Sequence, residues 1–160
     1  MSLNDLMTTH RRWMQEALTE AEAAAEAGDV PVGAVVVQNG EIVGRGRNRV
    51  EHQENPTAHA EMLAIQEACT TLGTKHLPDC TLYVTLEPCP MCAGAIVLAR
   101  LQRLVFGALD EKSGAASTLY AIPRDGRLNH QVDLLSGVEA DRAGNLLEEF
   151  FTQRRTDPAQ

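Results

Sequence analysis

The sequence predicts a three-layer α/β domain built around one mixed sheet of five strands. Segments with helical periodicity alternate with short β-branched runs along the 160 residues, which is the pattern of a sheet covered by helices. The composition, 44% hydrophobic and 22% charged, is that of a globular protein. No repeat, linker or low-complexity tract divides the chain. We therefore expect a single domain over residues 1–160, with its core at about residues 10–155.

The first half of the chain is expected to form a helix, a hairpin and a second helix. Apolar residues recur at helical spacing in the two helical segments. Asn39-Gly40 stands between two β-branched runs and predicts a hairpin, because both turn residues tolerate positive φ. In order, the expected elements are a helix over residues 4–27 closed by Gly28, strands at 32–37 and 42–43, a polar loop at 51–57, and a helix at 58–71 that stops near Gly73.

The second half continues the alternation. The run TLYVTL is typical of a buried strand, and a helix can begin soon after it because Pro is tolerated in a first helical turn. The expected elements are a strand at 81–86, a helix at 90–99, a strand at 103–106, one short helix near 115–120 in a polar, Gly-rich segment, a strand at 132–135 and a final helix at 139–154.

The net charge and the apolar segments constrain the partners and the location of the protein only weakly. The net charge is −8, which is unfavourable for a nucleic-acid binder unless basic side chains gather locally. Residues 1–10 lack the apolar segment of a secretory signal, and the longest apolar stretch, residues 93–99, is too short to span a bilayer. We expect a cytoplasmic protein with no membrane association. The arginines cluster in three places, each also interpretable as solvated surface: Arg11 and Arg12; Arg45, Arg47 and Arg49; Arg154 and Arg155.

Two short motifs carry the chemistry. His59-Ala60-Glu61 opens the second helix, and Pro88-Cys89-Pro90-Met91-Cys92 lies between a buried strand and the third helix. Two thiolates three positions apart at a helix start can bind one zinc ion, and His59 gives a third ligand. Three protein ligands leave a coordination position open, as in catalytic zinc sites, where the metal lowers the pKa of a bound water. We expect one zinc per chain.

Glu61 is two residues from a ligand in the same helical turn, where it can transfer protons without binding the metal. The order H-x-E…P-C-x-x-C is the signature of zinc deaminases of nucleobases. Alone, the Cys pair also fits a redox site or half of a structural zinc site, and His59 and Glu61 also fit a helix cap. Cys69 and Cys80 are interpreted as small buried hydrophobes, and Glu87 as a partner of nearby backbone N–H groups.

Beyond these motifs, the sequence resembles the bacterial tRNA-specific adenosine deaminases of the TadA type. The resemblance covers about residues 13–155 and rests on five segments: PVGAVVV, NPTAHAEM, TLYVTLEPCPMCAGAI, RLVFGALDEKSGAAS and LLEEFFTQRR. It implies a cytidine-deaminase-like fold, a homodimer, and hydrolytic conversion of adenosine to inosine at the wobble position of a tRNA anticodon.

The resemblance also implies roles for single residues. His59, Cys89 and Cys92 match the zinc ligands, and Glu61 matches the proton shuttle. The other matching positions are contacts to substrate: Asn48 and the Ala60 backbone N–H to the target base, Asp110 to a ribose of the anticodon loop, and Phe151 and Arg155 to RNA. Without the resemblance, Asn48 would be interpreted as a turn former and Asp110 as a loop residue.

The sequence differs from the family pattern at two places, and two other functions are compatible with the zinc motifs. Leu109 replaces a basic residue of some relatives, and the segment after Arg155 carries only Asp157 as a charge, which would reduce phosphate contacts. A free-base deaminase acting on guanine or cytosine would share the zinc motifs, and guanine deaminases resemble this chain around EPCPMC. The segments FGALDEKSGAAS and FFTQRR favour the tRNA enzyme. A non-catalytic zinc-stabilised module is disfavoured because the chain offers three ligands and a matching Glu.

Overall fold

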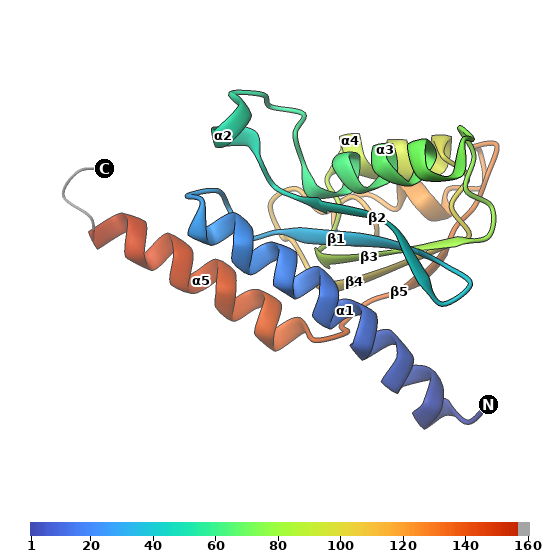
Figure 1. Cartoon of the computed structure of the whole chain (residues 1–160), viewed down its shortest axis with the longest axis horizontal. Helices are drawn as coiled ribbons and strands as arrows, with labels where there is room; N and C mark the ends of the chain where they lie inside the picture. Colours follow the sequence, from blue (N-terminus) through green and yellow to red (C-terminus); the bar gives the residue numbers. More distant parts are fainter. Residues whose placement is uncertain (157–160) are drawn as a thin grey trace.

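Five strands form one mixed sheet in the order β2-β1-β3-β4-β5, and helices cover both of its faces (Figure 1). The structure, a computed structural model, describes residues 1–156. The pairs β1–β2 and β1–β3 are antiparallel, whereas β3–β4 and β4–β5 are parallel. The expected three-layer architecture is confirmed. In chain order the elements are α1 (Leu3–Glu26), β1 (Gly33–Gln38), β2 (Glu41–Arg47), α2 (Val50–Gln53), α3 (Ala60–Leu72), β3 (Cys80–Leu86), α4 (Pro90–Leu98), β4 (Arg103–Ala108), η1 (Ile122–Arg124), β5 (Asp133–Leu135) and α5 (Ala140–Thr156).

Each face of the sheet has its own apolar layer. In β1, Val35 and Val37 face α1 and α5, while Ala34 and Val36 face α3 and α4, as the period of two in a strand requires. Figure 1 shows α1 and α5 side by side below the sheet and α3 and α4 above it. Because both faces are covered, the central strands are continuous apolar runs.

The hairpin forms as expected, with Asn39 and Gly40 at φ 51° and 75°. β2 runs from Glu41 to Arg47, well past the expected residues 42–43. Its glycines allow α3 to pack closely on it: a Cβ on Gly46 would lie 2.1 Å from the Ala60 carbonyl oxygen. This close packing fixes the start of α3 against the end of β2.

The expectations for two connecting segments, a loop at 51–57 and a short helix at 115–120, are wrong. The segment 51–57 contains part of the short helix α2, because the buried Asp29 carboxylate accepts the backbone N–H groups of Glu51 and His52 at 2.8 and 3.2 Å. Residues 115–120 form turns and no helix. The backbone N–H groups of residues 116–118 donate to the Glu87 side chain, so this segment folds around a carboxylate.

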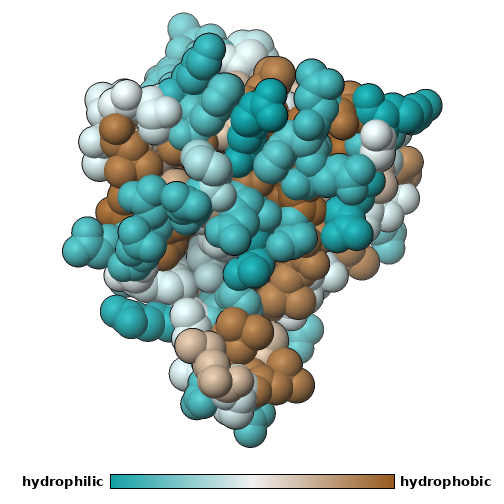
Figure 2. Space-filling model, turned by 90° about the vertical axis from the view of Figure 1, so that its right-hand side faces the viewer, coloured by the Kyte–Doolittle hydropathy of each residue, from teal (hydrophilic) through white to brown (hydrophobic). Residues whose placement is uncertain are grey.

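The first turns of α1 project beyond the sheet. Met1, Leu3 and Leu6 are exposed there, and apolar surface gathers at the lower end of the molecule in Figure 2. Among residues 1–156, none of the helices combines the length and the apolar character that crossing a membrane requires.

Candidate active site

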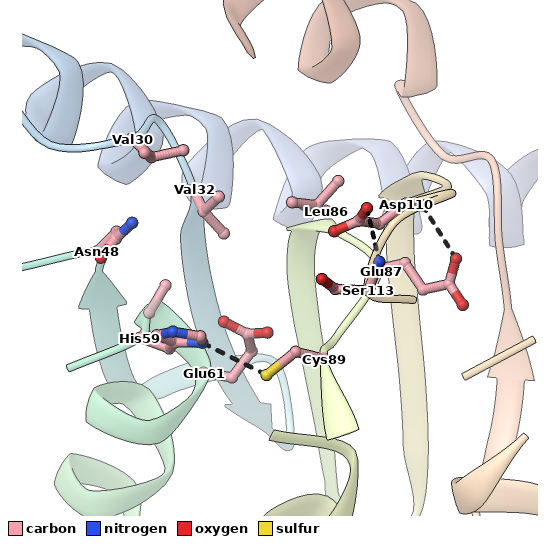
Figure 3. A pocket seen from close by; sticks show the side chains of 11 residues that line it. Val30, Val32, Asn48, His59, Glu61, Leu86, Glu87, Cys89, Asp110 and Ser113 are labelled. Carbon is pink, nitrogen blue, oxygen red and sulfur yellow. Dashed lines mark hydrogen bonds between the residues drawn. The ribbon is translucent and has the colours of Figure 1, made fainter. Parts of the chain in front are cut away.

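Several strands and helices begin or end along one edge of the sheet, at the ends of its strands. Since β1 is antiparallel to its two neighbours, its start lies beside the ends of β2 and β3, and β4 ends parallel to β3. The helices α3 and α4 both begin at this edge. A pocket of about 200 Å³ lies there (Figure 3), lined by Val30, Val32, Asn48, His59, Ala60, Glu61, Leu86, Glu87, Cys89, Asp110 and Ser113.

The structure brings His59, Cys89 and Cys92 together. His59 and Cys89 are the N-cap residues of α3 and α4, and neither side chain caps its own helix. Both are therefore free to turn toward each other across the helix starts. The sulfur atoms of Cys89 and Cys92 each lie 3.5 Å from Nδ1 of His59, and the three candidate ligand atoms lie within 4.8 Å of one another.

This donor set fits a zinc ion. Ligands at about 2.0–2.1 Å (nitrogen) and about 2.3 Å (sulfur) around a tetrahedral centre are separated by roughly 3.5 Å. The separations of 3.5 Å between Nδ1 and each sulfur agree with that geometry. Two sulfurs and an imidazole nitrogen are also the ligand types that zinc prefers. A redox pair of cysteines would not need His59 at equal distance from both sulfurs.

The electrostatics of the cluster favour a thiolate. The pKa of Cys89 is lowered to about 4, chiefly because the Cys92 thiol donates a hydrogen bond to it and secondarily because His59 does so. The same contact raises the pKa of Cys92, and the Cys89 contact raises that of His59. A negative charge is therefore favoured at Cys89, at the positive end of the α4 dipole.

Glu61 lies beside the three candidate ligands but outside their set. Its side chain is only 4% exposed, and Figure 3 shows its carboxylate pointing into the pocket between His59 and Cys89. Burial raises the pKa of Glu61 to about 7. A carboxyl group of that pKa can both accept and release a proton near neutral pH.

Three expected substrate residues line the same pocket. Ala60 is the buried first residue of α3. Asn48 follows β2, and its Oδ1 accepts the Val50 N–H at 3.1 Å. Within residues 1–156 its Nδ2 has no hydrogen-bond partner and remains available as a donor. The Asp110 carboxylate accepts the backbone N–H groups of Lys112 and Ser113. Asn48 and Asp110 are thus loop-forming residues that also face the pocket.

Phe151 and Arg155 lie outside this pocket, in a neighbouring hollow that shares Val30 with it. The hollow is lined by Val30, Glu51, Phe150, Phe151, Arg154 and Arg155. The hollow and the pocket are near each other because the C-terminal end of α5 lies at the same end of the molecule as α2 and the start of β1 (Figure 1). Phe151 is 44% exposed, although it is a large apolar residue.

The remaining residues singled out in the sequence fall outside the pocket. Cys80 is buried and Cys69 half-buried, and burial raises the pKa of both thiols. Arg45 pairs with Glu16 at 3.1 Å, and Arg154 donates to the Gly28 carbonyl oxygen at 3.1 Å. Leu109 is exposed at the pocket end of β4. The segment after Arg155 lies largely outside the described residues.

Sequence reasoning missed part of the pocket wall. Val30, Val32, Leu86 and Ser113 line it, although none of them is assigned a role from the sequence. Leu86 could have been found, because it is the last residue of an expected buried strand that leads directly to Cys89. Asp29, which holds α2 in place, has no sequence signal, since its buried position depends on contacts with a distant segment.

Comparisons with known proteins show the family to which this chain belongs. The MafB19-like deaminase family matches residues 8–155. A tRNA-specific adenosine deaminase of Bacillus subtilis (strain 168) is 51% identical over 93% of this chain and 92% of its own length. One of Aquifex aeolicus (strain VF5) is 48% identical over 91% and 95%. The chain belongs to the family of tRNA-specific adenosine deaminases.

Solved structures agree on the fold. A chain studied for A-to-I editing by tRNA:A34 deaminases at the wobble position of transfer RNA superposes with a TM-score of 0.82 at 42% identity, covering 85% of this chain and 99% of that one. A guanine deaminase of Nitrosomonas europaea gives a TM-score of 0.76 at 26% identity, covering 89% and 84%. The expected cytidine-deaminase-like fold is confirmed.

Proposed function

We propose that this protein is a hydrolytic deaminase that converts adenosine to inosine at the wobble position of a tRNA anticodon. The observation that carries the proposal is the buried Glu61 carboxylate beside the His59, Cys89 and Cys92 cluster, at the floor of an open pocket. The names of relatives about 50% identical over nearly the whole chain support adenosine in tRNA as the substrate.

His59, Cys89 and Cys92 would hold one zinc ion, which lowers the pKa of a bound water when present. Glu61 takes a proton from the attacking water and delivers it to the substrate. The water oxygen forms a bond to C6 of adenine, and the bond from C6 to the amino nitrogen breaks. One water is consumed for each inosine and ammonia formed. Glu61 ends the cycle in its starting protonation state.

Asn48 and the Ala60 backbone N–H would bind the base. The free Nδ2 of Asn48 offers a donor to an acceptor on the purine edge, while its Oδ1 stays bonded to Val50. The apolar side chains of Val30, Val32 and Leu86 supply surface for the rest of the ring.

The RNA would continue from the pocket across the neighbouring hollow. Asp110 stands at the pocket wall to contact a ribose. Phe151 offers an exposed ring on which a flanking base can stack, and Arg155 a cation for a phosphate. Sequence-specific RNA binding of this kind targets loops, whose bases can be splayed out.

A free-base deaminase acting on guanine is the second candidate, because a guanine deaminase shares the fold and covers most of this chain. The tRNA assignment is favoured by the higher identity to tRNA deaminases and by the open hollow beside the pocket, which a free base would not need.

We also expect a homodimer in the cytoplasm, where tRNA is found. Exposed Leu98, Leu119 and Tyr120 are apolar side chains that a second copy could cover. Light scattering of the zinc-loaded protein should give twice the chain mass, and a monomer at micromolar concentration would contradict this expectation.

The cellular test is sequencing of tRNAs from cells with and without the protein. Inosine is sequenced as G, so a wobble adenosine should appear as G only in cells that contain it. Cells carrying Glu61→Gln are the matched control and should keep A. Unchanged tRNA in the deletion strain would contradict the proposal.

A further inference from the structure

The buried carboxylate of Glu87 is the most heavily hydrogen-bonded side chain at the pocket. It is 2% exposed and lies two residues before Cys89. Its Oε1 accepts the Asp110 N–H at 3.1 Å and the Thr118 hydroxyl. Its Oε2 accepts the N–H groups of Ala116, Ser117 and Thr118 at 3.1, 2.9 and 2.9 Å. All five partners are donors, so both oxygens must be acceptors.

All five donors belong to one segment, residues 110–118, which leaves β4 and carries Asp110 and Ser113 into the pocket wall. The same segment is held a second time, because the Ala115 N–H donates to the Pro88 carbonyl oxygen at 2.8 Å. Residues 110–118 are therefore bonded to the two residues that precede Cys89. Figure 3 shows the Glu87 side chain directed away from His59 and Glu61, toward this segment.

Gly114 is an independent sign that the segment is shaped around Glu87. A Cβ at this position would lie 2.4 Å from Oε1 of Glu87 and 2.5 Å from the Asp110 carbonyl oxygen. Any side chain here would displace the carboxylate or the segment. The backbone thus approaches Glu87 more closely than a residue other than Gly allows.

We propose that Glu87 is a positioning residue for deamination: its carboxylate holds residues 110–118 as the pocket wall, so that the target nucleotide is aligned with Glu61 and the Cys89 side of the pocket. The inference rests on the proposed function and adds a residue to it. Glutamine cannot fully replace this carboxylate, because its NH₂ group would oppose the Asp110 N–H at the Oε1 position or three backbone N–H groups at the Oε2 position. Misplacement of a wall by a fraction of an ångström lowers the chemical rate as well as the affinity.

The test compares Glu87→Gln with Glu41→Gln, the same change at an exposed position of the β1–β2 hairpin. Both variants are purified with zinc, and kcat on an anticodon stem-loop is measured per zinc-loaded chain well below the melting temperature. We expect kcat of Glu87→Gln to fall about 10- to 100-fold, with zinc content unchanged. Amide hydrogen exchange should quicken at residues 116–118 while α4 stays protected. Glu41→Gln should match the wild type in every measurement.

Thr118→Val provides a second route, because it removes one donor and keeps the carboxylate. It should give faster exchange at residues 116–118 and a smaller loss of kcat, even if Glu87→Gln fails to fold. A variant with faster exchange or a lower melting temperature but wild-type kcat per zinc would overturn the positioning role and leave the proposed function intact. A wild-type protein inert on the stem-loop would instead overturn the proposed function itself.

Discussion

The two sides of the pocket are built by different means. His59, Glu61, Cys89 and Cys92 stand on the first turns of α3 and α4, which are backed by the apolar core. The loop side of the pocket comprises two loops, one with Asn48 near His59 and one with Asp110 beyond Cys89, and both are held by hydrogen bonds to buried or turn-forming side chains. The residues proposed for the chemical step are thus positioned by packing, and those expected to contact RNA by polar anchors such as Asp29 and Glu87.

This difference predicts different consequences of mutation. Changes on the helix side should abolish chemistry and leave the loops intact, whereas changes on the loop side should weaken selection of the substrate by smaller factors. The largest effects are expected at Cys89, Cys92 and Glu61, smaller ones at Asn48 and Arg155, and an effect on stability alone at His10.

Cys89→Ser and Cys92→Ser should lose zinc and essentially all activity, because no described side chain can replace a thiolate at the cluster. Metal analysis and ammonia release measure both effects. Cys69→Ser is the matched control and should keep about one zinc per chain with full turnover. An active, metal-free Cys89→Ser protein would refute the assignment of these residues as ligands.

Glu61→Gln should keep zinc and bind RNA, since Glu61 is not in the ligand set, yet lose about 10²–10⁴ in rate. Single-turnover kinetics on the stem-loop measure the loss. Turnover near that of the wild type would mean that another group transfers the proton.

A substitution at Asn48 can distinguish loop formation from substrate binding, because Asn48 both shapes a loop and faces the pocket. Asn48→Asp keeps the acceptor for the Val50 N–H but removes the Nδ2 donor. A lost hydrogen bond of about 0.5–1.5 kcal/mol corresponds to roughly a 2- to 13-fold decrease in kcat/KM. If Asn48 only forms the turn, Asn48→Asp should be as active as the wild type.

Arg155→Ala should weaken RNA binding a few-fold and make the slope of log affinity against log salt shallower by about one unit, if its guanidinium neutralises one phosphate. Arg11→Ala is the control, because Arg11 is exposed on α1 and lines neither the pocket nor the neighbouring hollow. Equal slopes for the two variants would exclude a phosphate contact at Arg155. Within the arginine cluster at residues 45–49, Arg45 is paired with Glu16 at 3.1 Å, so its charge is partly neutralised within the protein.

A titration on the far face of the sheet should affect stability alone. Burial, together with the charge of Arg103, lowers the pKa of His10 below 6.5, and its Nδ1 lies 2.9 Å from the Tyr83 hydroxyl. The unfolded chain therefore binds a proton more readily than the folded one, and stability falls as pH decreases through about 6.5. The melting temperature should fall by a few degrees between pH 7 and pH 5. His10→Gln should reduce this dependence, and an equal fall in His10→Gln would contradict it.

The sequence predicted the residues on the helix side of the pocket and the backbone N–H partners of Glu87, but it did not predict which loop segments the buried carboxylates hold. His59, Glu61, Cys89 and Cys92 lie in short motifs next to strong helix signals, so local pattern sufficed. Asp29 and Glu87 act on segments more than twenty residues away, and their partners are backbone N–H groups that every sequence contains. The same cause explains the wrongly expected helix at 115–120, where a distant carboxylate outweighed local propensity.

We expect the loop side to select an adenosine presented by RNA, while the helix side carries out the hydrolysis. The most direct test is ammonia release from an anticodon stem-loop with adenosine at the wobble position, beside free guanine and free adenosine at equal concentration. We predict inosine formation on the stem-loop with far slower turnover of both small molecules. Rapid turnover of free guanine with an inert stem-loop would contradict the account.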